Sequence, residues 1–314
     1  MAEKIESAFT ALGRIASGSE TTYNLEPSLF PDGGLRDGEL IEISGESNSG
    51  KSVLCHELIA RTILPTSCGG LELGAVLIDC ENSYSKAMLL NIMEKHIQNQ
   101  ANPAVARTLA DPCQLERIQQ DALHRLHLLA CYSLEQFELT LLALPKLFIT
   151  HPELTVVLID SIATFYWSKC TAKNRIRQDT YQRSYCKTFR RLAWKWKKVI
   201  LLTKPTYFGS RQGLGRDFEP MGGSLDGMMG STQSSVSLAG NVSSSLSTQP
   251  NERRTLNDHR VELCEIDTPT PSEEDTDGAN VEQRFSAFIT MGDKQKQYVR
   301  FYLIDQFGFN WLEA

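Results

Sequence analysis

The chain lacks three features that define other classes of protein. No apolar run approaches the length of a membrane-spanning helix, and residues 1–6 contain no hydrophobic signal-peptide region. The eight cysteines form no C-x-x-C pair, which argues against a disulfide framework or a zinc site. The formal net charge of −6 excludes a surface adapted to nucleic acid as a whole, although it permits a local basic patch. We therefore expect a soluble intracellular protein with reduced thiols and no membrane partner.

The clearest motif is a phosphate-binding loop of the form G-x-x-x-x-G-K-[ST]. Before it, residues 39–43 alternate as a short strand does, and after it apolar residues recur at helical spacing as far as Leu64, where Pro65 stops the helix. Such a loop points successive backbone N–H groups inward at a helix N-terminus, which favours phosphate. The alternative, a chance glycine turn, is disfavoured by the strand and helix on either side. The residues expected to bind the nucleotide are Gly45, Glu46, Ser47, Asn48, Ser49, Gly50, Lys51 and Ser52.

We expect the ligands to be ATP and Mg²⁺. Lys51 would contact the β and γ phosphates, and the Ser52 hydroxyl would bind the metal. A second metal-site residue is Asp160, which closes the apolar strand 154–160 and should therefore lie at the carboxyl edge of a parallel sheet. The alternative for Asp160 is a cap of the following turn.

Glu81 is the candidate catalytic residue. It ends a second apolar run, residues 75–81, which places it at the same sheet edge. Its carboxylate could deprotonate a water molecule that attacks the γ phosphate. It could equally be an exposed charge at a strand end, and its position in the sequence does not decide between these two roles.

Composition divides the chain into a core and appendages. After Pro205 the chain becomes rich in glycine, serine, threonine and asparagine, and such a segment buries too little apolar surface to offset its ordering entropy. Aromatic and β-branched runs then return between 285 and 312, as terminal antiparallel strands. We also expect residues 209–280 to be replaceable by a short linker. The predicted units are an N-terminal segment at 1–36, an ATP-binding core at 37–206, a disordered insertion at 207–281 and terminal strands at 282–314.

Two basic regions lie before this insertion. Residues 169–177 show little periodicity and suggest an exposed loop able to follow a phosphate backbone. Residues 187–198 resemble an amphipathic helix that leads into a strand at 199–202, and its apolar residues suit a core better than a base-stacking platform. The loop is thus the better candidate for nucleic acid, although a solvated loop is equally compatible with it.

Several segments together resemble the RecA-like recombinase superfamily, and within it the recombinase paralogues. The resemblance covers about residues 7–205 and, weakly, the terminal strands. The motif Asp-Ser-x-x-x-Phe-Tyr-Trp at residues 160–167 begins at the end of the strand 154–160. It is more specific than the phosphate loop, which many NTPases share. The matching segments are 25–30, 45–52, 63–65, 69–72, 77–79 and 158–167.

The resemblance implies an α/β fold with a mostly parallel RecA-like central sheet flanked by helices. It implies a nuclear subunit of a hetero-oligomer of recombinase paralogues, which helps the main recombinase assemble on single-stranded DNA during homologous recombination. Residues 169–184 take the place of the first DNA-binding loop, and single-stranded or branched DNA is the implied partner. Because the phosphate loop begins at Gly45, we expect no N-terminal helical DNA-binding domain.

One departure from the family concerns hydrolysis. Recombinases end the strand after the basic helix with a glutamine that senses the γ phosphate, whereas this chain has Thr203, Lys204 and Pro205 there. Nucleotide binding is compatible with this change, while DNA-coupled hydrolysis is in doubt. Two alternatives stay open: an active DNA-dependent ATPase, and an unrelated small-molecule kinase, which would need an acceptor site and an arginine-rich lid that the sequence does not show.

Recombinases of this family dock through an aromatic residue that precedes the ATPase core. Phe9, within the segment 7–12, is the corresponding candidate. The alternative is that Phe9 packs on the chain's own sheet, as lone aromatic residues in amphipathic segments usually do.

Overall fold

The computed structural model describes residues 21–100, 112–170, 175–207, 257–266, 283–292 and 296–312. In chain order the elements are β1 (Thr22–Tyr23), β2 (Leu35–Arg36), β3 (Leu40–Gly45), α2 (Lys51–Ile63), the short 3-10 helix η1 (Thr66–Cys68), β4 (Gly74–Asp79), α3 (Lys86–Gln100), α5 (Pro112–Leu123), β5 (Leu126–Ala130), α6 (Leu134–Thr150), β6 (Leu154–Asp160), α7 (Tyr166–Lys169), α8 (Gln178–Trp196), β7 (Val199–Pro205), β8 (His259–Glu265), β9 (Phe285–Met291), β10 (Lys296–Asp305) and β11 (Gly308–Leu312). Helix α2 ends where expected, because the proline at 65 disfavours a helical conformation at Leu64, whose backbone is extended.

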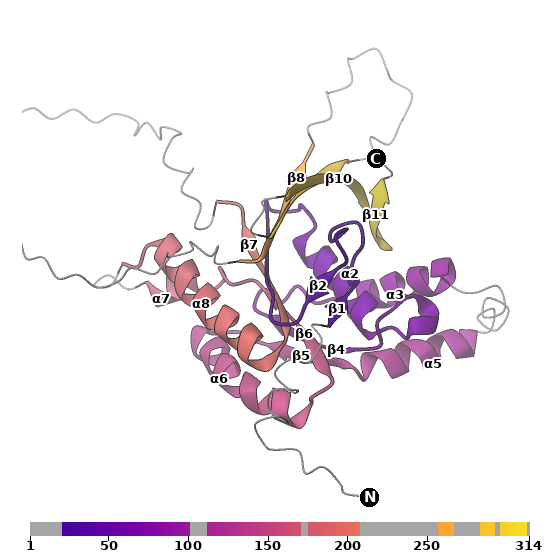
Figure 1. Cartoon of the computed structure of the whole chain (residues 1–314), viewed down its shortest axis with the longest axis horizontal. Helices are drawn as coiled ribbons and strands as arrows, with labels where there is room; N and C mark the ends of the chain where they lie inside the picture. The colour runs from indigo at the N-terminus through magenta and orange to yellow at the C-terminus, as the bar shows by residue number, and fades with distance from the viewer. Residues whose placement is uncertain are drawn as a thin grey trace, which may run out of the picture.

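A nine-stranded sheet forms the centre of the molecule (Figure 1). Its strand order is β11-β10-β9-β8-β3-β7-β6-β4-β5. The pairs from β8 through β3, β7, β6 and β4 to β5 are parallel, and β8, β9, β10 and β11 pair antiparallel. The predicted fold class, a mostly parallel RecA-like sheet with helices and terminal antiparallel strands, is confirmed.

Helices cover both faces of the sheet, so the structure has two hydrophobic cores. On β6, Val156 and Leu158 contribute to one core, and Val157 and Ile159 contribute to the other. This alternation follows from the period of two in a strand, and it explains why the buried strands read as continuous apolar runs. Helices α2, α3 and α5 lie on one side of the sheet, and α6, α7 and α8 lie on the other (Figure 1).

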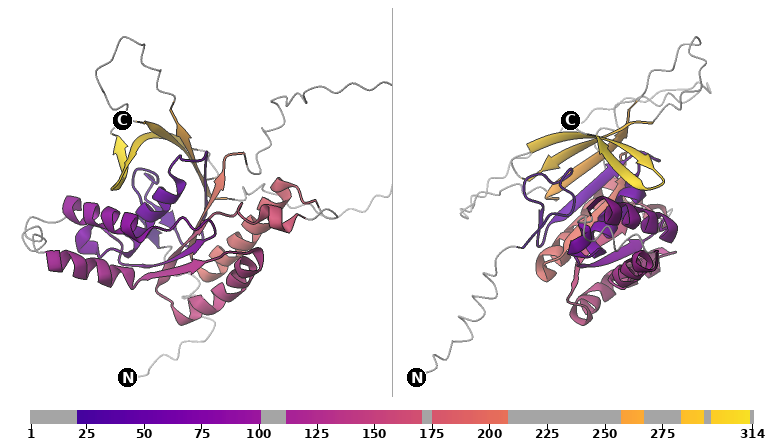
Figure 2. Two further views of the ribbon diagram at one scale, coloured as in Figure 1. Left: turned by 180° about the vertical axis from the view of Figure 1, so that it is seen from behind. Right: turned by 90° about the vertical axis from the view of Figure 1, so that its right-hand side faces the viewer.

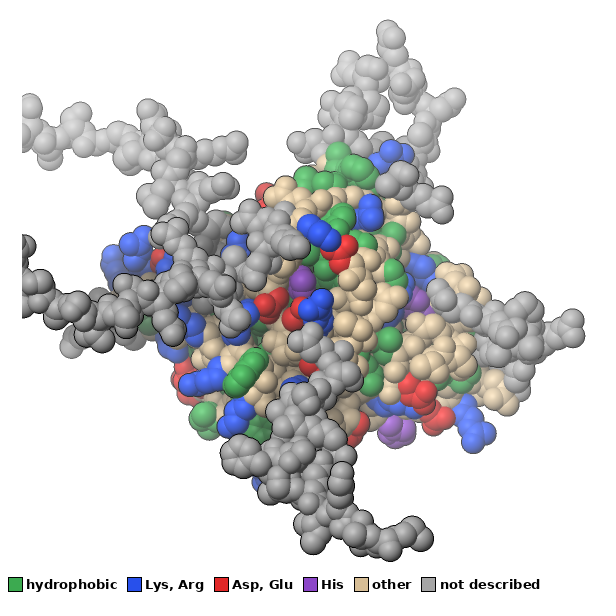
Figure 3. All heavy atoms as spheres, in the orientation of Figure 1, with side chains coloured by type: hydrophobic (Ala, Val, Ile, Leu, Met, Phe, Trp, Pro, Cys, Tyr) green, Lys and Arg blue, Asp and Glu red, His purple; other side chains and the backbone are tan. Residues whose placement is uncertain are grey.

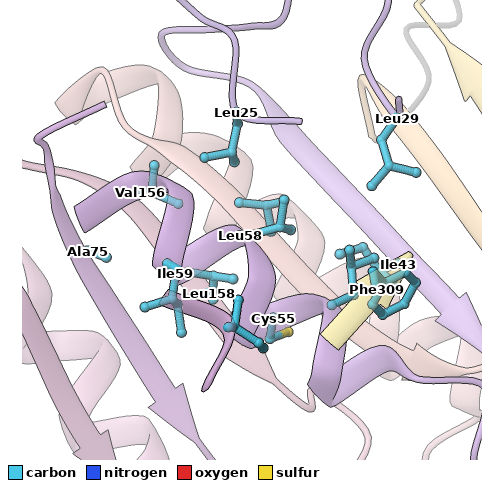
Figure 4. Close-up of a cluster of buried hydrophobic side chains, with 14 of the residues drawn as sticks. Leu25, Leu29, Ile43, Cys55, Leu58, Ile59, Ala75, Val156, Leu158 and Phe309 are labelled. Carbon is cyan, nitrogen blue, oxygen red and sulfur yellow. The ribbon is translucent and has the colours of Figure 1, made fainter. Parts of the chain in front are cut away.

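The terminal strands curve over α2 rather than extending the sheet flat (Figure 2). Strand β11 contacts α2, and its Phe309 joins the core beside Leu58 and Ile43 (Figure 4). The C-terminal strands are therefore part of the structure that surrounds the phosphate loop.

The structure corrects the predicted insertion at 207–281. Residues 257–266 contain β8, which pairs parallel with β3 and antiparallel with β9. The prediction of disorder is wrong for this stretch, because Val261 and Leu263 alternate with exposed residues and are both fully buried. The remainder of 207–281, apart from Tyr207, lies outside the described residues, as does Phe9.

The structure also corrects the basic regions. Helix α8 begins at Gln178, nine residues before the predicted helix, so the expected first DNA-binding loop is wrong for 178–184. Tyr181 and Tyr185 are buried at helical spacing in this part, and the polar residues between them concealed the pattern. Among the residues that the structure describes, no helix is long and apolar enough to cross a membrane.

Candidate functional site

The phosphate loop connects β3 to α2, as its sequence context predicted. Gly50 has a φ of 86°, in the left-handed region that favours glycine. The Lys51 Nζ donates hydrogen bonds to the carbonyl oxygens of Gly45 (3.0 Å) and Glu46 (2.6 Å), so the side chain folds back over its own loop. Burial lowers the pKa of Lys51, while the nearby carboxylates of Glu81 and Asp160 act in the opposite direction.

Strand β10 contacts the phosphate loop through two of its side chains. The Tyr302 hydroxyl on β10 donates a hydrogen bond to the Ser49 carbonyl at 2.8 Å, and the tyrosine is fully buried. A Cβ atom at Gly50 would overlap the Ile304 side chain. Sequence analysis did not find these contacts, because they join residues about 250 positions apart in the chain.

The Asp160 carboxylate lies close to the phosphate loop and accepts hydrogen bonds from three side-chain hydroxyl groups. Its Oδ2 accepts hydrogen bonds from Ser52 Oγ at 2.6 Å and Ser83 Oγ at 2.8 Å, and its Oδ1 accepts one from Thr203 Oγ1 at 2.5 Å. Ser52 and Asp160, predicted separately, are thus brought together. A carboxylate beside a hydroxyl offers the hard oxygen ligands that Mg²⁺ prefers, next to a cation and backbone N–H groups suited to phosphate. The residues present therefore fit MgATP.

Glu81 lies in a turn just beyond β4, which ends at Asp79. Its Oε1 accepts hydrogen bonds from Ser161 Oγ at 2.6 Å and from Thr164 Oγ1 at 3.4 Å. Ser161 directly follows Asp160 in the chain, so this hydrogen bond holds the Glu81 carboxylate close to the end of β6. The charge of Glu81 also acts on Lys51. The two predicted strand-end carboxylates thus meet at one edge of the sheet.

Asp79 is a residue that sequence analysis overlooked. It is buried, and its carboxylate accepts hydrogen bonds from the backbone N–H groups of Glu81 (3.2 Å), Ser83 (3.1 Å) and Tyr84 (3.0 Å). It therefore shapes the turn that positions Glu81 and Ser83. Asp79 ends an apolar strand, as Asp160 does, and this position in the sequence could have identified it as a candidate site residue.

His56 connects the same turn to α2. Its Nδ1 lies 2.6 Å from the Ser52 carbonyl oxygen, and its Nε2 accepts a hydrogen bond from the Ser85 backbone N–H at 3.0 Å. Because Nε2 accepts, Nδ1 must carry the proton and donate to Ser52. The imidazole thus fixes the first turn of α2 against the loop that follows β4.

The strand β7 places Lys204 and Pro205 on opposite faces of the sheet. The Lys204 Nζ forms a buried ion pair with Glu42 Oε1 at 3.1 Å, and Glu42 Oε2 also accepts from Gln182 Nε2 of α8 at 2.7 Å. Lys204 therefore points to the α8 side. Strand alternation directs Pro205, which is paired with Gly45, toward the phosphate-loop side. Pro205 therefore faces the phosphate loop, where the family resemblance implies a γ-phosphate sensor, and it has no side-chain donor.

Positive charge gathers at the side of the molecule formed by α7 and α8 (Figure 3). Of the predicted basic loop, residues 171–174 lie outside the described residues. Lys169 is not directed outward as a free cation, because its Nζ pairs with Glu138 Oε1 at 2.7 Å. The basic character of this side therefore comes largely from α8.

Helix α6 exposes apolar side chains. On α6, Leu139, Leu142 and Ile149 are 65%, 77% and 69% exposed and share one side of the helix; we call these three residues the α6 outer stripe. The neighbouring strand β5 ends the sheet and pairs only with β4 among the described strands. Exposed apolar stripes and open strand edges are common features of interaction surfaces.

Comparisons with known proteins find similarity to a recombinase family and to DNA repair proteins. The Rad51 family profile matches residues 11–127. The mouse DNA repair protein XRCC2 is 31% identical over 165 residues, 52% of this chain and 54% of the mouse protein. The Zea mays DNA repair protein RAD51 homolog A is 23% identical over 209 residues, 65% of this chain and 56% of the maize protein. The chain thus spans about half the length of these relatives.

A solved structure shares the fold. The crystal structure of the RadB recombinase superposes with a TM-score of 0.54 at 15% identity, covering 91% of this chain and 96% of that protein. At this identity the similarity concerns the fold alone. The chain therefore has a RecA-like fold, its residues 11–127 match the Rad51 family profile, and its sequence resembles that of the DNA repair protein XRCC2.

Proposed function

We propose that the chain binds MgATP and acts in the nucleus as a subunit of a recombinase-paralogue complex, which assists recombinase filament assembly on single-stranded DNA. The observation that carries the proposal is the meeting of Lys51, Ser52 and Asp160 at the carboxyl edge of the sheet. The similarity to XRCC2 and to RAD51 proteins supports the role in DNA repair.

In this proposal the chain's own residues account for nucleotide binding. On binding phosphate, the Lys51 ammonium would exchange its two loop carbonyls for phosphate oxygens. Ser52 and Asp160 would hold Mg²⁺, with Thr203 and Ser83 keeping the Asp160 carboxylate in place. Bound Mg²⁺ supplies charge neutralisation for the β and γ phosphates.

Assembly with other paralogues finds support in the exposed apolar residues of α6. The α6 outer stripe exposes three large aliphatic side chains, although the other side of the same helix is buried through Phe137, Leu144 and Phe148. A partner that covered the stripe would bury apolar area and gain about 25 cal/mol for each Å² removed from water. Among the described strands β5 ends the sheet, so its outer edge also offers backbone groups to a partner.

Leu142→Asp should weaken co-purification with partner paralogues by at least about tenfold, because a charge would face the apolar centre of the interface. The melting temperature should change little, since Leu142 is 77% exposed. Co-expression, affinity capture and quantitative mass spectrometry measure the effect.

The matched control is Trp194→Asp, which places a charge at an equally exposed apolar residue of α8. Equal partner recovery for Leu142→Asp and the wild type would refute the α6 outer stripe as the contact.

Phe9→Ala can be tested in the same co-purification experiment. If Phe9 docks into a neighbour, partner recovery falls at an unchanged melting temperature, and if it packs on the chain's own sheet, the melting temperature falls instead.

An active DNA-dependent ATPase is the second candidate, and the position of Glu81 beside Lys51 and Asp160 favours it. Pro205 opposes it, because this residue offers no donor to sense the γ phosphate. An unrelated small-molecule kinase gains no support, since the matched proteins are recombinases and DNA repair proteins.

The ATPase candidate predicts that Glu81→Gln lowers ATP turnover by about 10²-fold or more, because a positioned base is lost. Pro205→Gln should raise turnover or its response to single-stranded DNA, since it restores a side-chain donor on the loop side of β7. Steady-state phosphate release with and without DNA is the measurement. Equal rates for Glu81→Gln and the wild type would remove Glu81 from the catalytic residues.

A further inference from the structure

Two histidines and a glutamate cluster at the edge of the sheet opposite the nucleotide site. The ligand atoms of His127, His151 and Glu153 all lie within 4.8 Å of one another. The two imidazole rings are 4.5 Å apart between centroids, and His151 Nδ1 lies 3.1 Å from Glu153 Oε1. Both histidines are half-buried and Glu153 is exposed, so the cluster is open to solvent.

The cluster is supported by regular structure on both sides. His127 is the second residue of β5, where it pairs with Val76 of β4. His151 caps the C-terminus of α6, and its N–H donates to the Leu147 carbonyl at 2.8 Å. The Glu153 carbonyl accepts the Gly74 N–H at 3.1 Å. Backbone hydrogen bonds or strand pairing therefore hold all three residues in place.

The buried cation Lys198 is not among the ion-pair partners of the Glu153 carboxylate. Lys198 Nζ donates instead to the backbone carbonyl oxygens of Pro152, at 3.2 Å, and Leu154. It thereby holds the loop between α6 and β6 from the inside. Among the described residues, His151 is the ion-pair partner of Glu153.

We propose that His127, His151 and Glu153 bind a divalent transition-metal ion, with Zn²⁺ as the preferred ion, at a site separate from the MgATP site. Two imidazoles and one carboxylate are ligands typical of Zn²⁺, whereas Mg²⁺ prefers oxygen ligands alone. The His127 position at the start of β5 puts the site at the amino end of the parallel strands. Ser52 and Asp160 lie at the carboxyl end.

The spacing suits this ion after a small adjustment. Tetrahedral zinc with bonds of about 2.0–2.1 Å separates its ligand atoms by about 3.3 Å. The His151 and Glu153 atoms are already at 3.1 Å, so His127 has the main movement to make. Three protein ligands leave one tetrahedral position for water or for a group from a partner. Because β5 is the open edge strand, the site also borders the proposed assembly surface.

The test measures zinc binding to the full chain, without an affinity tag and with a phosphine reductant, by equilibrium dialysis. The wild type should bind one Zn²⁺ that excess Mg²⁺ does not displace. His127→Gln and Glu153→Gln should each lose more than about tenfold in affinity. The matched control is His124→Gln, which removes a neighbouring exposed histidine outside the cluster and should bind as the wild type does.

Co²⁺ provides an independent readout, because its absorption spectrum distinguishes nitrogen and oxygen ligands from thiolates. A spectrum without thiolate charge transfer, lost in His127→Gln, supports the site. Equal Zn²⁺ affinity in His127→Gln, Glu153→Gln and His124→Gln would overturn it, and so would the absence of Zn²⁺ binding to the wild type. If His127→Gln lowers the melting temperature of the metal-free protein, its loss of Zn²⁺ affinity could come from altered folding. The affinity of Glu153→Gln then decides whether the site exists, because the Glu153 side chain is exposed.

Discussion

Replacing Leu263 with aspartate is expected to abolish the cooperative unfolding transition of the protein. Leu263 is fully buried on β8, between Gly45 of β3 and Ala287 of β9. An unpaired charge there costs several kcal/mol in addition to the lost burial of the leucine, against a total stability of about 5–15 kcal/mol for a typical domain. Thermal and denaturant unfolding followed by circular dichroism measure the effect.

The matched control is Glu262→Ala at the next residue of the same strand, whose side chain is exposed. It should change the melting temperature only slightly. An unchanged transition in Leu263→Asp would show that β8 does not belong to the folded core.

The position of β8 also overturns the expectation that residues 209–280 can be replaced by a short linker. This replacement should prevent folding, because it removes the strand between β3 and β9.

Saturating ATP with Mg²⁺ is expected to raise the melting temperature, and Lys51→Ala should remove most of this increase. A ligand that binds only the folded state adds about 2.7 kcal/mol at 100 times its dissociation constant. For a chain of this size, that corresponds to a shift of about 5 °C or more. Lys51 is the cation of the loop and lies close to Asp160, so its loss removes the main charge contact for phosphate.

Two serines provide a matched pair for the metal. Ser52 and Ser83 both donate to Asp160 Oδ2, at 2.6 Å and 2.8 Å, but only Ser52 belongs to the phosphate loop. In the wild type, MgATP should raise the melting temperature more than ATP with a chelator does. Ser52→Ala should lose this difference, and Ser83→Ala should reduce it less, because Ser83 orients Asp160 and is not itself a proposed metal ligand. An identical shift in the wild type and Lys51→Ala would show that the nucleotide binds elsewhere or not at all.

The sequence by itself determined the elements whose signal is local. The phosphate loop was predictable because its glycines, Lys51 and Ser52 are contiguous and lie between a strand and a helix. The strand that ends at Asp160 was predictable because a strand buried on both faces reads as an uninterrupted apolar run. From these two elements the meeting of Ser52 and Asp160 followed, since ligands gather at the carboxyl edge of a parallel sheet.

Only the tertiary structure decided the features that depend on pairing between distant segments. Strand β8 stands within a polar stretch, so its burial comes from β3 and β9 rather than from its own composition. The opposite orientations of Lys204 and Pro205 depend on the register of β7, and a shift of one residue would exchange them. His127 and His151 became neighbours because β5 and the end of α6 meet at the sheet edge, a contact between residues separated by 24 positions that no local pattern encodes.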